Sequence, residues 1–322
     1  MIVTGATEPD TPPSRAPWRS YATLTIVMLL WAGNSIVGRA IRADVPPFTL
    51  ALVRWTGAAL IILPFAWRHL ARDRAVMLQH WRPLLILGLT GVGAFNALLY
   101  SGLRYTTATN GLLMQAAIPA AVLLFNRIGV GVRAGRMEVV GVAISTMGVL
   151  YVVAGGVPRS ILARTFNVGD LLILCGVACW AAYTVILRFR PECSPLSFLL
   201  ATFIIGIVTM APLAATEADR IATIPLRGTV LAAFAYVAVL PSLVAYMLYI
   251  RAVRDLGAAA AGQTISLMPL FGSLLAVLLL GERLHAYHLW GMAAILAGIV
   301  ISAMRTGSQH RSSGRMPRAR QL

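Results

Sequence analysis

Apolar residues occur along this chain in runs of about 20, the length that crosses roughly 30 Å of bilayer hydrocarbon as an α-helix. Short segments rich in Arg, Pro and Gly separate the runs. The pattern predicts ten membrane-spanning helices, at residues 20–39, 48–67, 83–102, 106–126, 136–155, 168–188, 196–215, 229–250, 257–280 and 285–304. No polar segment between them is long enough to bury a core of its own. We therefore expect an all-α integral membrane protein.

The second half of the chain repeats the first. Leu103 to Gly148 returns 150 residues later as Val253 to Gly298, and an earlier part returns at an offset of 149. Pro and Gly carry most weight here, because their positions determine where the backbone turns. The matched pairs include Trp31 with Trp180, Pro46 with Pro195, Pro119 with Pro269, Gly131 with Gly281, Gly141 with Gly291, and Gly148 with Gly298.

Each copy holds five spans, and an odd number makes the second copy enter the membrane from the opposite face. The expected fold is therefore ten helices arranged as two inverted-topology five-helix repeats around a central cavity, an arrangement suited to alternating access. Pro46-Pro47 and Pro195 should begin the second helix of each half, and Asn167 and Asp170 suit a helix start. The expected divisions are a disordered N-terminus (1–18), the first repeat (19–155), a linker (156–167), the second repeat (168–304) and a basic tail (305–322).

Composition agrees with a membrane protein: 58% of the 322 residues are hydrophobic, 12% are charged, and the mean hydropathy is +0.78. The net charge of +16 does not indicate nucleic-acid binding, because the 27 basic residues, all Arg, form no basic face interleaved with aromatics. Counted by predicted side, 18 Arg lie on the side of the N-terminus and 8 on the other. That bias predicts a multi-pass protein of the cell membrane with both termini in the cytoplasm.

Several features argue against other classes of protein. The first apolar run is too long for a signal peptide and lacks a clear cleavage site, so we interpret it as an uncleaved span. Cys175, Cys179 and Cys193 have neither the neighbouring ligands of a metal site nor the spacing of a disulfide framework. No catalytic motif and no P-loop is present, so we expect no enzyme, no cofactor, no metal and no ATP-driven pump.

Arg54 is the one charged residue well inside a predicted span. A charge at that depth is costly, and three interpretations remain open. The side chain snorkels to the nearer surface, it binds an anionic group such as a carboxylate in a polar cavity, or it pairs with backbone carbonyls at a broken helix. Its counterpart in the second copy is Phe203, so the repeat itself does not require an Arg.

Uncharged polar and aromatic residues lie in spans one, four, six and nine. Each taken singly fits a hydrogen bond between helices, because lipid offers no partner. Their symmetric placement favours a central cavity lined from both halves. The candidate substrate-binding residues are Arg54, Trp31, Asn34, Gln115, Trp180, Tyr183, Gln263 and Ser266.

Pro119 and Pro269 lie in the middle of spans four and nine, where they should bend the helix. They are either plain structural kinks or paired gates. No Asp or Glu lies in mid-span, since Glu138, Asp170 and Glu282 all fall at span ends. A carboxylate relay deep in the membrane is therefore not expected.

The sequence resembles the drug/metabolite transporter superfamily, and within it the ten-helix EamA-type group with two tandem EamA-like domains. The resemblance rests on Trp31-Ala-Gly-Asn34, on Pro47 to Arg54, and on Pro269 followed by Leu280-Gly281-Glu282-Arg283-Leu284, Gly291 and Gly298. It covers about residues 20–304. One departure is that the first copy has Gly131-Val132-Arg133, so the first-half Glu is lost.

This resemblance implies a basket of ten helices that moves small metabolites, commonly by export of amino acids or related compounds. We expect a secondary transporter whose partners are a small-molecule substrate and the lipid bilayer, with a monomer sufficient for the mechanism. The alternative is a membrane protein without a carrier cycle: a channel-like protein, a lipid scramblase or a structural partner. The substrate, the coupling ion and the net direction are left open.

Overall fold

The computed structural model describes residues 17–131, 135–156, 167–256 and 265–303, and every regular element in these ranges is a helix. The first part contains α1 (Pro17–Ala40), α2 (Pro47–Gln79), α3 (Trp81–Leu87), η1 (Gly88–Ala94), α4 (Phe95–Gly102), α5 (Ala108–Gln115), α6 (Ile118–Val130) and α7 (Arg136–Val153). The second part contains α9 (Val168–Ile186), η2 (Leu187–Phe189), α10 (Pro195–Ala215), α11 (Ala218–Ile221), α12 (Gly228–Val239), η3 (Leu240–Val244), α13 (Ala245–Leu256), η4 (Ile265–Leu267), α15 (Met268–Leu280) and α16 (Ala286–Ala303). The all-α prediction is confirmed for these ranges.

Seven helical stretches are long and apolar enough to cross a membrane. They are Trp18–Ala40, Pro47–Gln79, Trp81–Gly102, Ala108–Gly129, Val168–Phe189, Pro195–Ala215 and Gly228–Tyr249. The other three predicted spans coincide with α7, α15 and α16, whose described apolar stretches are shorter, Val139–Val152 and Met268–Leu280 among them.

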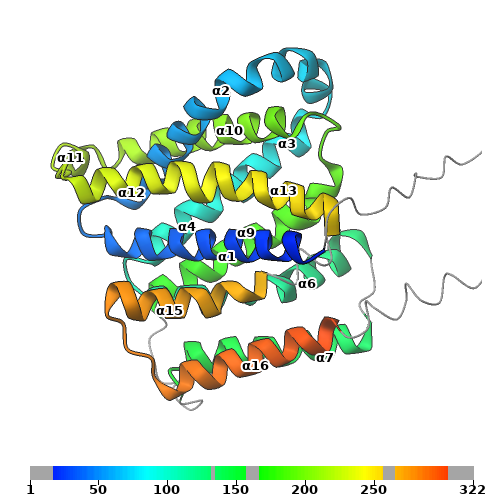
Figure 1. Cartoon of the computed structure of the whole chain (residues 1–322), viewed down its shortest axis with the longest axis vertical. Coiled ribbons are helices and arrows are strands. Elements are labelled where there is room, and N and C mark those ends of the chain that lie inside the picture. The colour runs from blue at the N-terminus through cyan, green and yellow to red at the C-terminus, as the bar shows by residue number, and fades with distance from the viewer. Residues whose placement is uncertain (1–16, 132–134, 157–166, 257–264, 304–322) are drawn as a thin grey trace, which may run out of the picture.

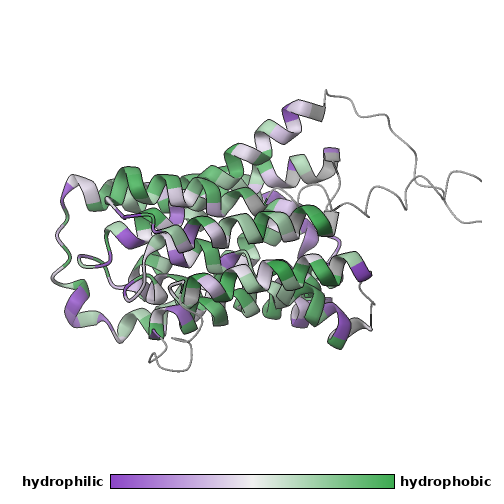
Figure 2. Cartoon of the chain, turned by 90° about the horizontal axis from the view of Figure 1, so that it is seen from below, coloured by the Kyte–Doolittle hydropathy of each residue, from purple (hydrophilic) through white to green (hydrophobic). Residues whose placement is uncertain are grey.

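The helices lie side by side in one bundle (Figure 1). α2 packs against α10 at one edge, α7 packs against α16 at the opposite edge, and α1, α9 and α15 lie between them. Hydrophilic residues gather toward the two ends of the bundle, whereas the helices between are mostly hydrophobic (Figure 2). That distribution suits a protein whose middle lies in hydrocarbon.

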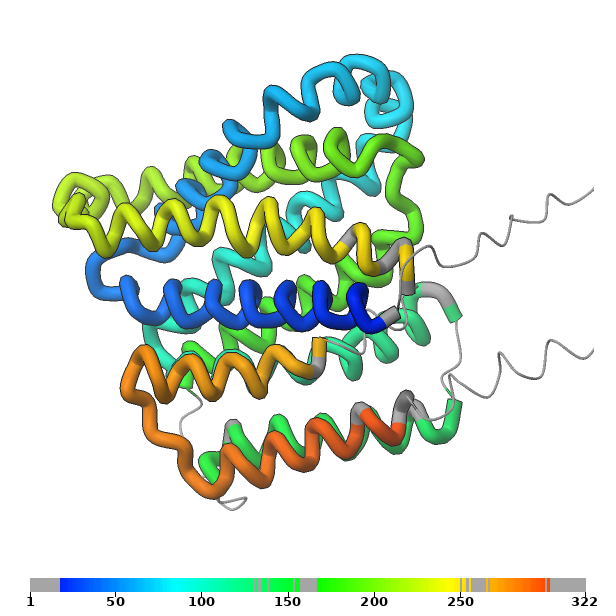
Figure 3. Tube along the Cα trace, in the orientation of Figure 1, coloured from blue at the N-terminus to red at the C-terminus, as the bar shows by residue number. Residues whose placement is uncertain are grey.

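α7 and α16 run side by side along their length (Figure 3). Their backbones approach closely because glycines replace side chains at the contact: a Cβ on Gly148 would lie 2.8 Å from the Gly291 carbonyl oxygen. A Cβ on Gly298 would overlap the carbonyl of Gly141. The Ser145 hydroxyl donates across the pair to the Ile295 carbonyl at 3.1 Å. Small residues at such a spacing are what allow two membrane helices to approach closely.

α2 is longer than the sequence pattern predicted. The span was expected to end near Trp67, but the helix continues to Gln79 and has 33 residues. At 1.5 Å per residue that is about 50 Å, well beyond the hydrocarbon thickness. The prediction was wrong because hydropathy marks the edge of the membrane, whereas nothing in the next twelve residues ends the helix.

The first turns of α2 and α10 are each capped by a carboxylate that lies at the far end of the other helix. Glu217, just after α10, accepts hydrogen bonds from the Thr49 backbone N–H and hydroxyl, both at 2.8 Å. Asp73, late in α2, accepts from the Ser194 N–H and the Ser197 hydroxyl, also at 2.8 Å. The first N–H groups of a helix have no partner within it, and a negative charge is favourable there. This exchange holds the two helices antiparallel.

A third carboxylate caps α5. Glu282, in the Gly-Glu-Arg segment after α15, accepts from the Ala108 N–H at 2.8 Å and from the Thr109 hydroxyl at 2.8 Å. The first-half counterpart, Val132, lies outside the described residues. Asn167 caps α9 as predicted, because its side chain accepts from the Gly169 N–H at 2.8 Å.

The fourth and ninth predicted spans are broken where the sequence predicted a bend. Pro119 lies in the first turn of α6 and Pro269 in the first turn of α15, positions that tolerate a missing N–H. Gly131 and Gly281 end these helices with φ of 72° and 64°. Only glycine adopts that left-handed backbone readily, which explains why both copies keep it.

Candidate functional site

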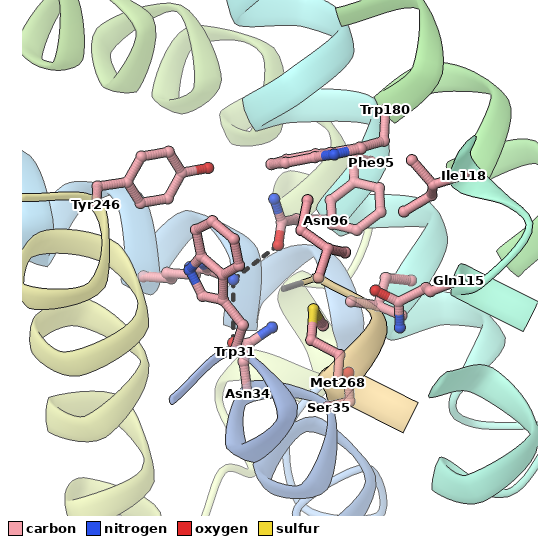
Figure 4. A pocket seen from close by; sticks show the side chains of 13 residues that line it. Trp31, Asn34, Ser35, Phe95, Asn96, Gln115, Ile118, Trp180, Tyr246 and Met268 are labelled. Atoms are coloured by element: carbon pink, nitrogen blue, oxygen red, sulfur yellow. Dashed lines mark hydrogen bonds between the residues drawn. The ribbon is translucent and has the colours of Figure 1, made fainter. Parts of the chain in front are cut away.

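A cavity lies between the helices of both halves of the chain. The space between its lining side chains is about 500 Å³, a volume that includes open solvent at the mouth of the cavity. The lining residues are Trp31, Asn34, Ser35, Arg54, Phe95, Asn96, Leu99, Gln115, Ile118, Trp180, Tyr246, Ile265 and Met268. Figure 4 shows Tyr246 on one side, Gln115 and Ile118 on the other, and Trp31 between them.

Arg54 is held at this cavity by four hydrogen bonds to side chains. Its Nε donates to the Ser242 hydroxyl at 2.7 Å. Its Nη1 donates to the Asn34 amide oxygen at 3.0 Å, to the Asn96 amide oxygen at 2.7 Å, and to the Tyr100 hydroxyl at 3.0 Å. The residue is 3% exposed. The buried guanidinium therefore does not snorkel to the surface, and within the described part of the chain it donates to no backbone carbonyl.

The positive charge of Arg54 has no acidic partner among the described residues, where the ion pairs found are Arg72–Asp73 and Arg227–Asp44. Its guanidinium lies 4.4 Å from the ring centre of Trp55, which stabilises the cation in part. Within the same ranges, Nη2 donates no hydrogen bond. A buried cation without a counter-ion is costly. The arrangement can therefore bind an anionic group that reaches the Arg54 guanidinium through the cavity.

Aromatic side chains form one wall of the cavity. The ring centre of Trp31 lies 6.3 Å from that of Trp180 and 5.6 Å from that of Tyr246, and both contacts are edge-to-face. Phe95 lies 4.8 Å from Trp180. Trp31 is fixed by its Nε1, which donates to the Pro241 carbonyl at 3.1 Å. A wall of this kind can bind an apolar or planar body by stacking and burial.

Uncharged polar groups also line the cavity. The Nε2 of Gln115 donates to the Gly111 carbonyl at 3.2 Å, and its Oε1 has no hydrogen bond to any described residue. The Ser35 hydroxyl is buried and likewise lacks a described partner. The Asn34 amide nitrogen donates to no residue in the described ranges, although its oxygen accepts from Arg54 and Tyr100. Buried polar groups normally have partners, so these three are available to a ligand.

The structure brings together most of the candidate residues named from the sequence. Trp31, Asn34, Arg54, Gln115 and Trp180 all line the cavity. Tyr183 lies behind Trp180 at 5.2 Å and does not line it. Gln263 lies outside the described residues, as does the side chain of Ser266. Their assignment stays a prediction.

Other lining residues were missed as site candidates, although the repeat offset could have revealed several. At 150 residues, Asn96 corresponds to Tyr246, Gln115 to Ile265 and Ile118 to Met268, and both members of each pair line the cavity. In two of these pairs the first half contributes an amide side chain, Asn96 or Gln115. The second half contributes the larger or more apolar member, Tyr246 or Ile265. Ser242 gave no signal, since it contacts Arg54 from 188 residues away.

The breaks at the two prolines lie beside the cavity. Gln115 ends α5 and Ile118 begins α6, while Ile265 and Met268 begin η4 and α15. Each break therefore places two lining residues at a point where the helix is discontinuous.

A sequence model of the EamA-like transporter family matches residues 18–154 and again residues 167–304. The chain belongs to the EamA-like transporter family. Together with the seven apolar stretches, membership makes this EamA-like transporter a multi-pass membrane protein.

Relatives from bacteria and archaea carry matching names. An uncharacterized transporter of Archaeoglobus fulgidus is 26% identical over 299 residues, which cover 91% of this chain and 99% of that protein. The uncharacterized transporter YyaM of Bacillus subtilis is 27% identical over 220 residues, covering 68% of this chain and 72% of the relative. The uncharacterized inner membrane transporter YedA of Escherichia coli is 25% identical over 87% of this chain and 89% of its own. These names indicate transporters rather than enzymes.

A solved crystal structure, described only as that of a protein, shares the fold. It superposes with a TM-score of 0.61 at 19% identity, over 92% of this chain and 99% of the other. At that identity the likeness concerns the fold alone.

Proposed function

We propose that this EamA-like transporter is a secondary transporter for a small solute that combines an anionic group with an apolar body. The observation that carries the proposal is the Arg54 guanidinium, which is buried, has a free Nη2, and has no acidic partner among the described residues. An anionic solute would supply the missing counter-charge, and the aromatic wall would hold its body.

The chemistry of the cavity favours amino acids or related compounds. Arg54 Nη2 and the Asn34 amide nitrogen are two donors for a carboxylate, and charge-assisted bonds of this kind are strong. Gln115 Oε1 and the Ser35 hydroxyl offer acceptors for an amino group. The resemblance to metabolite transporters makes export the expected direction, with no cofactor required.

Alternating access is the mechanism that fits the pairing of the two halves. We infer ten spans in two inverted repeats, with Pro119 and Pro269 at the hinges of paired gates. The equivalent breaks and the equivalent lining pairs support this arrangement, because exchanging the roles of the halves would open the same site to the other face. The Arg bias favours the cell membrane, with both termini in the cytoplasm.

Counterflow in proteoliposomes tests the proposal. Vesicles are loaded with amino acids, nucleobases and small organic anions, and uptake of each labelled compound is followed. We expect saturable uptake that needs the loaded partner and that Arg54→Ala lowers by about tenfold or more, the cost of losing a charged hydrogen bond. Arg68→Ala is the matched control, since Arg68 is an exposed Arg of the same helix.

Other outcomes would contradict the carrier. Flux that ignores the internal pool and does not saturate would indicate a channel, and lipid movement without solute a scramblase. Unchanged affinity in a folded Arg54→Ala variant would remove the anion anchor.

A further inference from the structure

The third helix of each half contains a π-helical segment at an equivalent place. η1 covers Gly88–Ala94 and η3 covers Leu240–Val244. At the 150-residue offset, η3 corresponds to residues 90–94, the last part of η1. π-helical turns are rare and frequently occur at functional sites. Ser242, within η3, and Asn96, two residues after the end of η1, both accept a hydrogen bond from Arg54.

In η3, Ser242 is oriented by a missing backbone donor. Pro241 has no N–H, so the carbonyl of Val237, four residues earlier, loses its usual helical partner. The Ser242 hydroxyl donates to that carbonyl at 2.8 Å. Its single proton is thereby used, and its lone pairs are left to accept from Arg54 Nε at 2.7 Å. The proline thus determines which way the hydroxyl points.

Asn96, directly after η1, is oriented in the same manner. Its amide nitrogen donates to the carbonyl of Val92 within η1 at 3.2 Å. Its amide oxygen is therefore turned toward Arg54 Nη1, from which it accepts at 2.7 Å. The guanidinium is consequently held from one side by the first half of the chain and from the other by the second.

We propose that Ser242 is a positioning residue for the anion site: through its bond to Nε it fixes the orientation of the Arg54 guanidinium at the cavity, and so determines selectivity for anionic solutes without contacting them. Ser242 is fully buried and does not line the cavity, so it can act only through Arg54. The inference rests on the proposed function in that Arg54 is the anion anchor.

The test compares two probes of equal shape, phenylacetate and its uncharged amide phenylacetamide, by quenching of tryptophan fluorescence in the purified full-length protein. Trp31 and Trp180 line the cavity and report on occupancy. In Ser242→Ala we expect phenylacetate to bind about tenfold more weakly, the loss typical of one hydrogen bond to a charged group. Binding of phenylacetamide should not change. Ser242→Thr keeps the hydroxyl and should retain the affinity for phenylacetate.

A second variant separates positioning from folding. Pro241→Ala in the Ser242→Ala background returns an N–H to the Val237 carbonyl, so thermal stability should recover while phenylacetate binding stays weak. Recovery of both, or an equal loss for both probes in Ser242→Ala, would make Ser242 a structural residue only and overturn the inference.

A third measurement needs no ligand. Phenylglyoxal modifies arginines, and peptide mass analysis reports the rate at Arg54. We expect a several-fold faster reaction in Ser242→Ala, because the guanidinium is then held by one hydrogen bond fewer and its reactive Nη atoms move more freely, and an unchanged rate would overturn the inference whether or not a probe binds. If the unsubstituted protein shows no counterflow but all three results hold, the transport proposal fails and the positioning role stands.

Discussion

At the scale of single residues, the site depends on a charge that the protein binds but does not neutralise. Arg54 donates hydrogen bonds to four side chains, all of them uncharged: Asn34, Asn96, Tyr100 and Ser242. An acidic partner would have cancelled the charge and closed the site to anions. Neutral acceptors fix the geometry of the guanidinium and leave its electrostatic field directed at the cavity.

Replacement of Trp31 should affect the apolar body of a ligand and not its charge. We expect Trp31→Ala to weaken phenylacetate and phenylacetamide equally, by about tenfold, because a stacking wall is lost. Trp31→Phe keeps a ring but loses the bond to the Pro241 carbonyl, and should cost about 1 kcal/mol of stability with little loss of binding.

The measurements are the fluorescence titration and thermal unfolding in detergent. Trp290→Ala serves as the control, because Trp290 is 69% exposed on α16. If Trp31→Ala weakened the binding of phenylacetate but not that of phenylacetamide, the aromatic wall would act on the charge of the ligand.

Single residues also show what sequence reasoning can and cannot reach. Asn167 was interpreted correctly, because a helix cap acts on its own backbone. The position of Arg54 in its helix was equally visible. Its partner Ser242 was not, since the contact depends on how two distant helices pack.

At the scale of elements, the clearest feature is the exchange of carboxylates between α2 and α10. We expect Glu217→Gln to lower the free energy of unfolding by roughly 0.3–1 kcal/mol, because the amide oxygen still accepts the hydrogen bonds and only the favourable charge at the helix start is lost. Asp73→Asn should lower it for the same reason. The two effects should add, because the sites lie at opposite ends of the helix pair. Thermal or chemical unfolding of both single variants and the double variant measures this.

Glu192→Gln is the control for that series, since Glu192 is an exposed loop carboxylate. A double variant that loses much less than the sum would show that the two caps are energetically one unit.

The α7–α16 pair permits a second prediction at this scale. A Cβ at Gly298 would overlap the Gly141 carbonyl and the Ser145 hydroxyl, so Gly298→Ala must separate the two helices. We expect a loss of about 1–3 kcal/mol, the range seen when a close contact is overpacked. Gly129→Ala is the control, because no atom lies within 4 Å of its Cβ position. If Gly298→Ala unfolds no earlier than Gly129→Ala, the close approach contributes nothing to stability.

Sequence reasoning predicted the helices less accurately than it predicted the local role of single residues. The pattern predicted a single span at 83–102, whereas the structure has α3, η1 and α4 in that range. A π-helical segment keeps the chain apolar and helical, so hydropathy does not register it. The extension of α2 to Gln79 was missed for a related reason. Hydropathy shows whether a segment lies in lipid or in water, but it does not show where a helix ends.

At the scale of the whole molecule, the distribution of Arg predicts an orientation. We expect the C-terminus, the segment after Arg188 and the N-terminus to lie in the cytoplasm, and the loop containing Arg220 to lie outside. Reporter fusions after residues 322, 191 and 224, using fluorescent protein and alkaline phosphatase, distinguish the two sides. Phosphatase activity at residue 322 would reverse the assignment and exchange the faces of the cavity.

The carboxylate exchange also bears on how the protein is made. The start of α2 depends on Glu217, the start of α5 depends on Glu282, and Arg54 depends on Ser242. All three partners are synthesised only after the first half has left the ribosome. The first half therefore enters the bilayer with two helix starts that only the second half can cap, and with a buried Arg54 whose last hydrogen bond, to Ser242, comes from the second half. Its helices can reach their final register only when translation of the chain is nearly finished, so premature termination leaves an incomplete and exposed intermediate for quality control to remove.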